Sequence, residues 1–361
     1  MKNLIADDDV TGRSSAEASA QAEVHQGGRT SHPHKDGATL AWLSILSILT
    51  LLSICWMEAG CSRPEPSPLR VGSLVWPGYE PFYTARQLGY LDEKQVRLME
   101  YTSTSETIRA FSNGTIEAGM MTLDEALLLA QDVPDIRLVL VLDYSNGADM
   151  IMARPEIAGL KDLKGRRVGA DTSAMGAYML MRALQLADLT PQELEIVPLA
   201  PTEHEAAFTQ GLVDAVVTGD PTGTKLRNFG ARQIFDSSQI PGEIVDVLVV
   251  RDAYLQAHLE TVKHLLQAYY RARVYCKEKP QEAAEIAALR AKISPQEFLS
   301  SLDGLLLPEA DESRRMLMGK PPVLLKNAQT LAAVMREKGL LRKDVDIQAL
   351  FDERTLARLL P

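Results

Sequence analysis

A ten-residue pattern occurs twice in this chain, 97 positions apart. Residues 110–119 read AFSNGTIEAG and residues 207–216 read AFTQGLVDAV. Both copies have Ala-Phe, then Gly, an aliphatic residue, an acid and Ala in the same register. A pattern that recurs at a fixed offset indicates a duplicated structural unit. The sequence therefore predicts two lobes built on one plan.

Two further matches keep the same offset and extend this prediction. Val71-Gly72 and Val168-Gly169 each open an apolar run, and DMIMAR begins at Asp149 where DVLVVR begins at Asp246. Between these matches, short apolar runs alternate with helical patterns, which is typical of a parallel or mixed sheet covered on both faces. We therefore expect an α/β fold with two doubly wound lobes, joined by a two-strand hinge at the two hexapeptides, with a cleft between the lobes.

The predicted boundaries follow from composition and periodicity. The first 37 residues are polar and lack an apolar period, so we expect a disordered leader. After residue 250, apolar residues recur at helical spacing, which predicts a helical C-terminal segment. The predicted segments are a leader (1–37), a signal peptide or membrane segment (38–60), a linker (61–68), lobe I (69–153 plus 248–361) and lobe II (154–247).

An apolar run precedes the predicted lobes. Residues 38–57 read ATLAWLSILSILTLLSICWM, and Glu58-Ala59-Gly60-Cys61 follows. Ala-Gly-Cys after an apolar run resembles the lipobox of bacterial lipoproteins, in which the Cys is acylated, although Glu58 departs from that motif. The alternative is an uncleaved membrane anchor of about 20 residues. Both interpretations tether the body at the periplasmic or extracellular face of the cytoplasmic membrane, and the first makes Cys61 the lipidation site.

Composition argues against several classes of function. From residue 61 onward the chain has 34 basic and 41 acidic residues, a net charge of −7, which gives no electrostatic reason to bind nucleic acid. No P-loop, GxSxG or paired CxxC motif is present. His204 lies between Glu203 and Glu205, but no second set of residues has metal-ligand spacing. We therefore predict no catalytic residues, no metal site and no cofactor.

Four segments resemble a known family. They are residues 76–93, 110–130, 162–180 and 211–226, which include WPGYEPFY, AFSNGTIEAGMMTLDEA, DLKGRRVGADTSAMGAYML and GLVDAVVTGDPTGTKL. In this order they resemble the substrate-binding proteins of ABC importers, in the nitrate, sulfonate and taurine group that is related to thiamin-pyrimidine binders. The resemblance implies a periplasmic-binding-protein fold of type II. It also implies a monomer that closes on a small molecule and delivers it to an ABC permease and ATPase. The alternative is a ligand-sensing module for a membrane signalling partner.

The candidate ligand-binding residues lie in loops that follow predicted strands, because ligands of doubly wound lobes bind beyond the carboxyl ends of strands. Trp76 and Tyr79 flank Pro-Gly, so their rings can face a ligand; the alternative is that they pack in the core. Residues 173–176 precede a helix, whose free N–H groups can hold a polar or anionic group or can simply be capped. The predicted ligand-binding residues are Trp76, Tyr79, Glu80, Thr122, Asp124, Asn146, Asp149, Ser173, Ala174, Met175, Gly176, Asp220 and Glu243.

The charges in these loops bear on the kind of ligand. The loops are acidic and contain almost no basic residue, whereas a site for a bare oxyanion is expected to offer Arg, Lys or His. Carboxylates and aromatic rings favour a ligand with amine or ring N–H donors, and the nitrate, sulfonate and taurine class remains open. The alternative is that some of these acids cap helices or face solvent. The acidic residues are Glu80, Asp124, Asp149, Asp171, Asp220 and Glu243.

Overall fold

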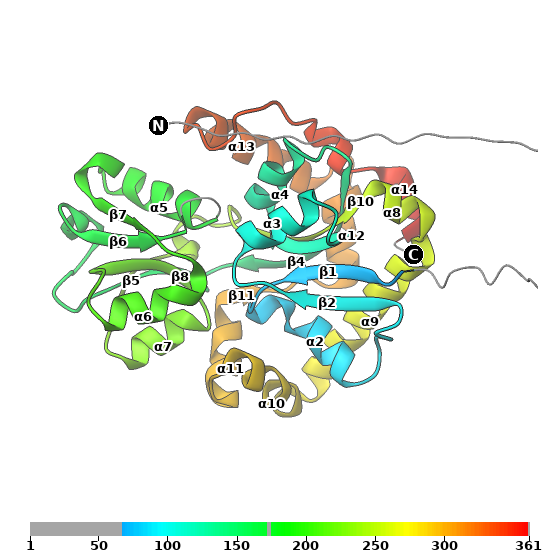
Figure 1. Ribbon diagram of the computed structural model, residues 1–361, viewed down its shortest axis with the longest axis horizontal. Helices are drawn as coiled ribbons and strands as arrows, with labels where there is room; N and C mark the ends of the chain where they lie inside the picture. The colour runs from blue at the N-terminus through cyan, green and yellow to red at the C-terminus, as the bar shows by residue number, and fades with distance from the viewer. Residues whose placement is uncertain (1–66, 172–174, 360–361) are drawn as a thin grey trace, which may run out of the picture. The chain divides into compact units, whose positions relative to one another are not determined.

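The computed structural model describes residues 67–171 and 175–359. The predicted leader and apolar segment, Cys61, Ser173 and Ala174 lie outside the described residues. The described chain contains two β-sheets (Figure 1). The first sheet has the order β11-β4-β10-β3-β1-β2, and the second has the order β7-β6-β8-β5-β9. The predicted two-lobed α/β fold is confirmed.

Each lobe is built around its own sheet. The strands of the first sheet are β1 (Leu69–Ser73), β2 (Val96–Glu100), β3 (Ala118–Thr122), β4 (Ile136–Ser145), β10 (Val245–Arg251) and β11 (Leu305–Leu306). The strands of the second sheet are β5 (Asp149–Ala153), β6 (Arg167–Ala170), β7 (Glu195–Pro198), β8 (Ala215–Gly219) and β9 (Arg232–Asp236).

The helices alternate with the strands as far as β10 and then follow one another. Between the strands lie α2 (Glu80–Gln87), α3 (Thr104–Ser112), α4 (Leu123–Ala130), α5 (Met175–Leu186), α6 (His204–Thr209) and α7 (Thr222–Asn228). After β10 come α8 (Asp252–Ala257), α9 (Leu259–Glu278), α10 (Pro280–Ala291), α11 (Pro295–Ser301), α12 (Ala310–Met318), α13 (Val323–Glu337) and α14 (Glu353–Leu359). Short 3-10 helices include η1 (Pro77–Tyr79), η4 (Pro201–Glu203), η5 (Ser237–Gln239) and η6 (Leu302–Gly304).

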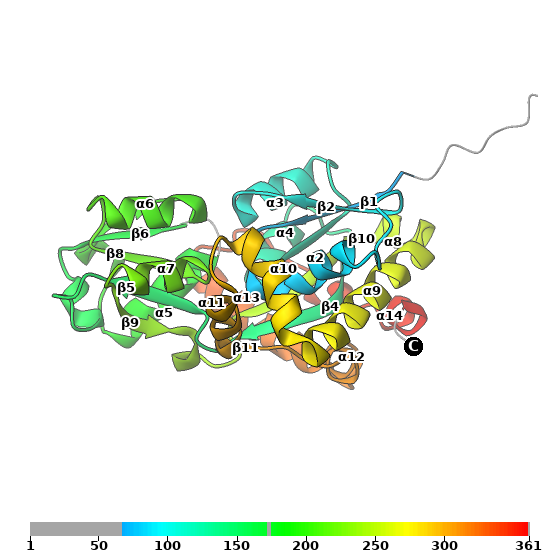
Figure 2. The ribbon, with the colours of Figure 1, turned by 90° about the horizontal axis from the view of Figure 1, so that it is seen from below.

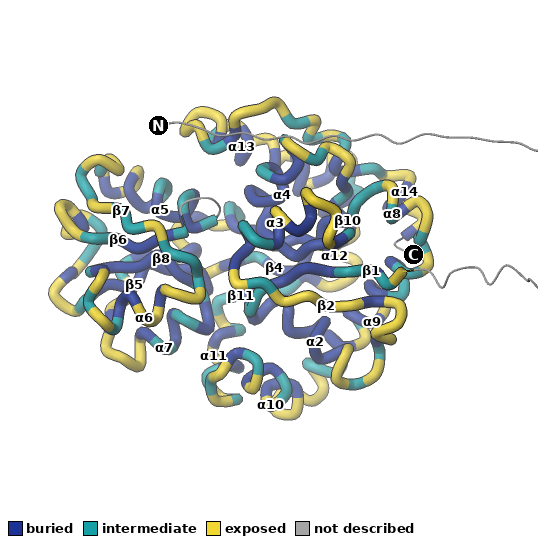
Figure 3. Tube along the Cα trace, in the orientation of Figure 1, coloured by how far each residue is buried: buried dark blue, intermediate teal, exposed yellow. Residues whose placement is uncertain are grey.

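The second sheet is covered on both faces, as the alternation of strands and helices predicted. Helix α5 lies on one face, and α6 and α7 lie on the other (Figures 1 and 2). Strand β5 shows the period of two that this arrangement requires, because successive side chains of a strand point to opposite faces. Ile151 and Ala153 pack in the core on the α5 side, whereas Met150 and Met152 pack with Phe208 on the α6 side. The inner strands of both sheets are accordingly buried along most of their length, whereas the outer strands β2, β7 and β9 are largely exposed or half-buried (Figure 3).

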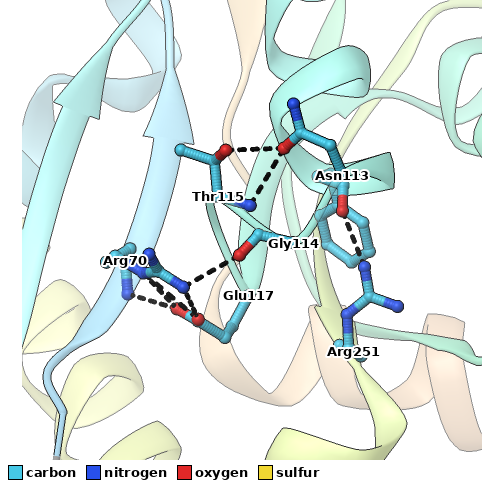
Figure 4. A network of polar contacts seen from close by, with 7 residues as sticks. Arg70, Asn113, Gly114, Thr115, Glu117 and Arg251 are labelled. Carbon is cyan, nitrogen blue, oxygen red and sulfur yellow. Dashed lines mark hydrogen bonds and ion pairs between the residues drawn. The ribbon is translucent and has the colours of Figure 1, made fainter. Parts of the chain in front are cut away.

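The duplication inferred from the sequence is present in three dimensions, contact by contact. In lobe I, Arg70 on β1 donates from its backbone N to Glu117 Oε2 at 3.0 Å and pairs with the same carboxylate through its guanidinium (Figure 4). In lobe II, Arg167 on β6 donates from its backbone N to Asp214 Oδ2 at 3.0 Å and forms an ion pair of 2.6 Å. Both pairs tie the parallel strand to the acid of the repeated pattern, 97 residues apart.

The Arg that ends each hexapeptide also has the same role in both lobes. Arg251 (Figure 4) donates to the carbonyl of Phe111 at 2.6 Å and lies over its ring. Arg154 does the same with Phe208 at 2.9 Å. These contacts cross the two halves of the repeat. Arg154 follows the first copy of the pattern but contacts the second, while Arg251 follows the second copy and contacts the first. The crossing strand of each half therefore completes the other lobe.

This exchange corrects the predicted domain boundaries at residues 153 and 248. Strand β5 pairs with β8 and β9 and so belongs wholly to the second sheet. Strand β10 begins at Val245, pairs with β3 and β4, and belongs wholly to the first. Each hexapeptide supplies a strand of the lobe that it enters, because its apolar side chains are buried in that lobe's core. The connections between the lobes lie just before β5 and just before β10.

These two connections are bonded to each other. Ser145, at the end of β4, lies 2.8 Å from Ser237 on η5, oxygen to oxygen, and the Ser237 hydroxyl accepts from Gly147 N at 2.7 Å. A third segment supports them, since the carbonyl of Gly304 accepts from Asn146 N at 2.8 Å and from Ala148 N at 3.2 Å. The two crossings therefore form one hydrogen-bonded unit, the hinge, with η6 against it.

The predicted helical C-terminal segment is confirmed, and it packs with lobe I. Helix α9 contributes Leu265, Ala268 and Tyr269 to the same hydrophobic core as β1 and β10. Helix α12 of this segment packs on β4. Among the described residues, no helix has the length and apolar character needed to cross a membrane.

Candidate functional site

A cavity of about 520 Å³ is lined by residues of both lobes. Lobe I contributes the loop after β1, the end of β2, the start of α3, α4 and the end of α10. Lobe II contributes the end of β6, the start of α5, the segment from η4 into α6, and the loop from β8 into α7. These positions are mostly carboxyl ends of strands, where ligands of doubly wound sheets bind. The cavity is therefore the candidate site.

Trp76 is one of two aromatic residues of the cavity wall, with Tyr101. It is 7% exposed, and its Nε1 donates to Asp143 Oδ2 at 3.1 Å, which fixes the ring. A Cβ added to Gly219 would lie 2.8 Å from Trp76 Cζ3, so the ring of lobe I lies directly against β8 of lobe II. Gly219 thus allows the close approach, and the indole face is held where both lobes meet.

Three carboxyl groups of the wall have no ion-pair partner among the described residues: Glu125, Asp149 and Asp220. Burial raises the pKa of Asp149 to about 7, against the effect of a hydrogen bond from Ser145. Burial and then the neighbouring Asp124 raise the pKa of Glu125 to about 8. Burial likewise raises the pKa of Asp220, whose Oδ1 accepts from Thr224 N and Thr224 Oγ1 at 2.9 Å. Asp220 therefore caps α7, whereas Asp149 lines the cavity with no ion-pair partner.

Glu125 also connects the lobes. Its Oε2 accepts from Thr122 N at 2.9 Å, and its Oε1 accepts from Met175 N, the first residue of α5, at 3.5 Å. A carboxylate of lobe I thus occupies the N-terminus of a lobe II helix, where the helix dipole favours negative charge. An anionic ligand group at this place would have to displace Glu125.

The structure places five of the predicted residues in the cavity wall and six elsewhere. The wall includes Trp76, Asp149, Met175, Gly176 and Asp220. Tyr79 is buried and donates its O–H to Asp246, so this ring packs in the core and does not line the cavity. Thr122 and Asp124 lie at the buried start of α4, and Asn146 is exposed at the hinge. Glu80 pairs with Arg290, and Glu243 pairs with Arg182 at 2.6 Å and accepts from Tyr178.

His204 lines the cavity and was not predicted as a ligand-binding residue. It begins α6 and is 3% exposed; its Nδ1 lies 3.1 Å from Thr218 Oγ1, while its Nε2 has no hydrogen-bond partner. Burial lowers the pKa of His204 to about 4, so the ring is neutral at neutral pH. The rule that selects loops after strands would have found it, had the loop after β7 been included. No group of His, Cys, Asp and Glu in the described chain is arranged to hold a metal ion.

The wall also contains basic residues that the loop-by-loop reasoning missed, which corrects the prediction of an almost wholly acidic site. Lys225 comes from α7, Arg290 from the last turn of α10, and Lys292 follows that helix. Lys225 lies 3.5 Å from Glu205, and Arg290 pairs with both Glu80 and Glu100. Lys225 and Arg290 are therefore already paired, whereas the exposed Lys292 and the buried carboxyls Glu125 and Asp149 have no ion-pair partner among the described residues.

Two curated relatives from Escherichia coli K12 are similar in sequence. A putative aliphatic sulfonates-binding protein is 24% identical over 319 residues, which cover 84% of this chain and 94% of that protein. A taurine-binding periplasmic protein is 25% identical over 167 residues, which cover 45% of this chain and only about half, 52%, of that protein. These relatives are solute-binding proteins.

Solved structures agree on the fold. The alkanesulfonate-binding protein SsuA from Xanthomonas axonopodis pv. citri, bound to MOPS, matches with a TM-score of 0.67 at 19% identity, over 79% of this chain and 98% of that one. A mutant of the desulfurization enzyme DszB, bound to biphenyl-2-sulfinic acid, matches with a TM-score of 0.58 at 17% identity, over 81% and 99% of the two chains. The fold alone therefore hosts both binding proteins and an enzyme.

A family model covers most of the chain. The model of the NMT1-like family matches residues 62–291, which include both copies of the repeated pattern and all the strands of the two sheets except β11. The protein belongs to the NMT1-like family.

Proposed function

We propose that this protein is an extracytoplasmic, lipid-anchored solute-binding protein that closes on a small molecule and delivers it to an ABC import permease and ATPase. The observation that carries the proposal is the cavity whose wall comes from two lobes connected by a short hinge. The relatives named for taurine and aliphatic sulfonates support the same class. A sensing module for a membrane signalling partner would use the same closure, and a neighbouring kinase or cyclase gene in place of permease and ATPase genes would favour it.

A binding role accounts for the cavity better than an enzymatic one. The wall holds the buried carboxyls Glu125 and Asp149, whose pKa values are raised, and a neutral His204, and no cysteine is among the lining residues, since Cys276 lies in a different cavity. Trp76 supplies an apolar face for a ligand, and His204 Nε2 supplies one unused hydrogen-bonding atom. A few polar groups converging on an apolar surface are typical of a ligand pocket.

The ligand class follows from the unpaired carboxyls. Asp149 and Glu125 can each accept from an amine or a ring N–H, and a bound cation would favour their ionised forms. A simple oxyanion would instead meet Glu125 at the α5 N-terminus, and the basic residues Lys225 and Arg290 are already paired. The proposed ligand therefore carries at least one N–H donor, as taurine or an aminopyrimidine does, with Trp76 against its apolar part.

Closure is the mechanism that this arrangement supports, and X-ray scattering tests it. Saturation of the purified monomer with its ligand should reduce the radius of gyration, because both walls of the cavity must contact one small molecule. The melting temperature should rise at the same time by mass action. A ligand that raises the melting temperature and leaves the scattering curve unchanged would contradict closure, but it would leave binding intact.

The lipid anchor is a separate part of the proposal, and it rests on Ala59-Gly60-Cys61 after the apolar run. We expect cells fed labelled palmitate to label the wild-type protein, and we expect Cys61→Ser to remove the label and to release the body or leave an uncleaved precursor. A wild-type protein that stays in the membrane without palmitate would instead identify residues 38–57 as an uncleaved anchor.

A further inference from the structure

A second cavity, of about 170 Å³, lies in lobe I among α2, α9, α10 and α11. These helices pack against one another in the order α2, α9, α10 and α11 (Figures 1 and 2). The second cavity and the candidate site share no lining residue. Its wall is mainly apolar and includes Pro81, Ala284, Ala287, Phe298 and Leu302. An apolar cavity of about 150 Å³ is large enough to hold benzene.

Glu80 is the exception in this wall. It is 3% exposed, and its Oε1 accepts from Arg290, whereas its Oε2 is buried without a hydrogen-bond partner. No other lining residue of the second cavity has an unpartnered buried side-chain atom in the part of the chain that the structure describes. A buried carboxylate oxygen is normally hydrogen-bonded, so this atom needs a donor from outside the chain.

The two cationic side chains of the wall already have partners. Arg273 donates to the carbonyls of Leu307 and Pro308 at 3.3 Å, and Lys277 pairs with Glu309. These two cations disfavour a cationic guest, and Glu80 disfavours an anionic one.

We propose that the second cavity binds a small neutral molecule of about the size of benzene, with one hydroxyl that donates to Glu80 Oε2. Glu80 also bonds Arg290, which lines the candidate site and donates to Glu100 Oε2 at 2.7 Å and to Leu74 O at 2.9 Å. The Glu80–Arg290 pair is thus the partition between the two cavities. Unlike the candidate site, the second cavity is formed within lobe I alone, so this proposal does not depend on solute delivery.

Cys276 makes the proposal testable, because its side chain lines the same cavity. Phenol is the probe, and fluorobenzene, which has nearly the same shape but no donor, is the matched control. The measurement is the rate of Cys276 alkylation by iodoacetamide in the purified full chain, followed by peptide mass spectrometry over a range of probe concentrations. Unfolded protein serves as the reference in which neither probe should change the rate.

We expect phenol to protect Cys276 at a concentration at least tenfold lower than fluorobenzene does. Ala284→Leu fills the cavity and should abolish protection by both probes. Equal protection by phenol and fluorobenzene would overturn the role of Glu80, and no protection by phenol up to its solubility limit would overturn the binding site. The comparison of the two probes uses only the wild-type chain, so it decides the question even if Ala284→Leu does not fold.

Discussion

Taurine or another ligand with an ammonium group is expected to bind about tenfold more tightly at pH 8 than at pH 6. In the free protein the pKa of Asp149 is about 7 and that of Glu125 is about 8, both raised by burial, so these carboxyls carry protons at pH 6. A bound ammonium group favours the ionised carboxylate and lowers its pKa in the complex. The complex then holds fewer protons than the free protein, and by linkage the affinity rises with pH across this window.

The sign of this effect identifies the charge of the ligand. An oxyanion next to the same carboxyls raises their pKa values, so the affinity for ethanesulfonate or nitrate should fall between pH 6 and pH 8. Titration calorimetry in two buffers of different ionisation enthalpy measures the affinity and the protons released or taken up. Tight binding of nitrate or ethanesulfonate, with affinity that does not fall at high pH, would contradict our account of the charges.

Matched variants locate the effect. Asp149→Asn removes one titrating carboxyl with little change in shape, and it should reduce the dependence of taurine affinity on pH. Asp344→Asn makes the same chemical change at a side chain that is 98% exposed, and it should leave the pH profile unchanged. Asp220→Asn should have a smaller effect than Asp149→Asn, because Asn can also accept the hydrogen bonds that cap α7.

The second large effect is expected at the hinge, where Gly304→Ala should lower the melting temperature by about 10 °C. An added Cβ would lie 2.6 Å from Ala148 N and 2.9 Å from Ala148 Cα, so backbone must move. Movement also weakens the hydrogen bonds that the Gly304 carbonyl accepts from Asn146 N and Ala148 N. Overpacking of this kind costs about 3 kcal/mol, and each kcal/mol shifts the melting temperature of a chain of this size by about 2–4 °C.

Gly159→Ala is the matched control for this substitution. The backbone at Gly159 is extended, with φ of −167°, and an added Cβ would meet nothing within 4 Å. Scanning calorimetry should therefore find Gly159→Ala close to the wild type. If Gly304→Ala has the same melting temperature as the wild type, the contact of η6 with the hinge does not contribute to stability. The same variant should also show a smaller change in scattering on binding ligand, because the hinge segments are displaced.

The two-lobed architecture was predictable from the sequence because the two copies of the repeated pattern form the same local structure and the same contacts in their lobes. Gly114 and Gly211 have φ of +76° and +78°, and each follows the helix of the repeated pattern. A residue that must adopt the left-handed conformation is almost always Gly, so local sequence specifies the end of the helix. The apolar run of β5 and the helical spacing in α9 are likewise local properties, which is why both elements were predicted.

Tertiary packing, and not the local sequence, determines which lobe contains each crossing strand. The hexapeptides at Asp149 and Asp246 are equally apolar, so nothing in their composition tells which lobe buries them. Pairing of β5 with β8, and of β10 with β3, places each strand in the lobe opposite to the copy of the pattern that precedes it. Both strands lie in the interior of their sheets, between neighbours distant in sequence, and this pairing moved the predicted boundaries by several residues.

The candidate site, too, was partly predictable from the sequence and partly determined by tertiary packing. Loops after strands could be identified by sequence, and five of the predicted residues, including Trp76 and Asp149, line the cavity. Whether a loop residue faces the cavity or the core depends on neighbours distant in sequence. Tyr79 is turned to Asp246, 167 residues away, and Glu80 is turned to Arg290, 210 residues away. The sequence by itself determined the kinds of side chain near the site, whereas only tertiary packing decided which carboxyls are paired, because pairing depends on distance in space.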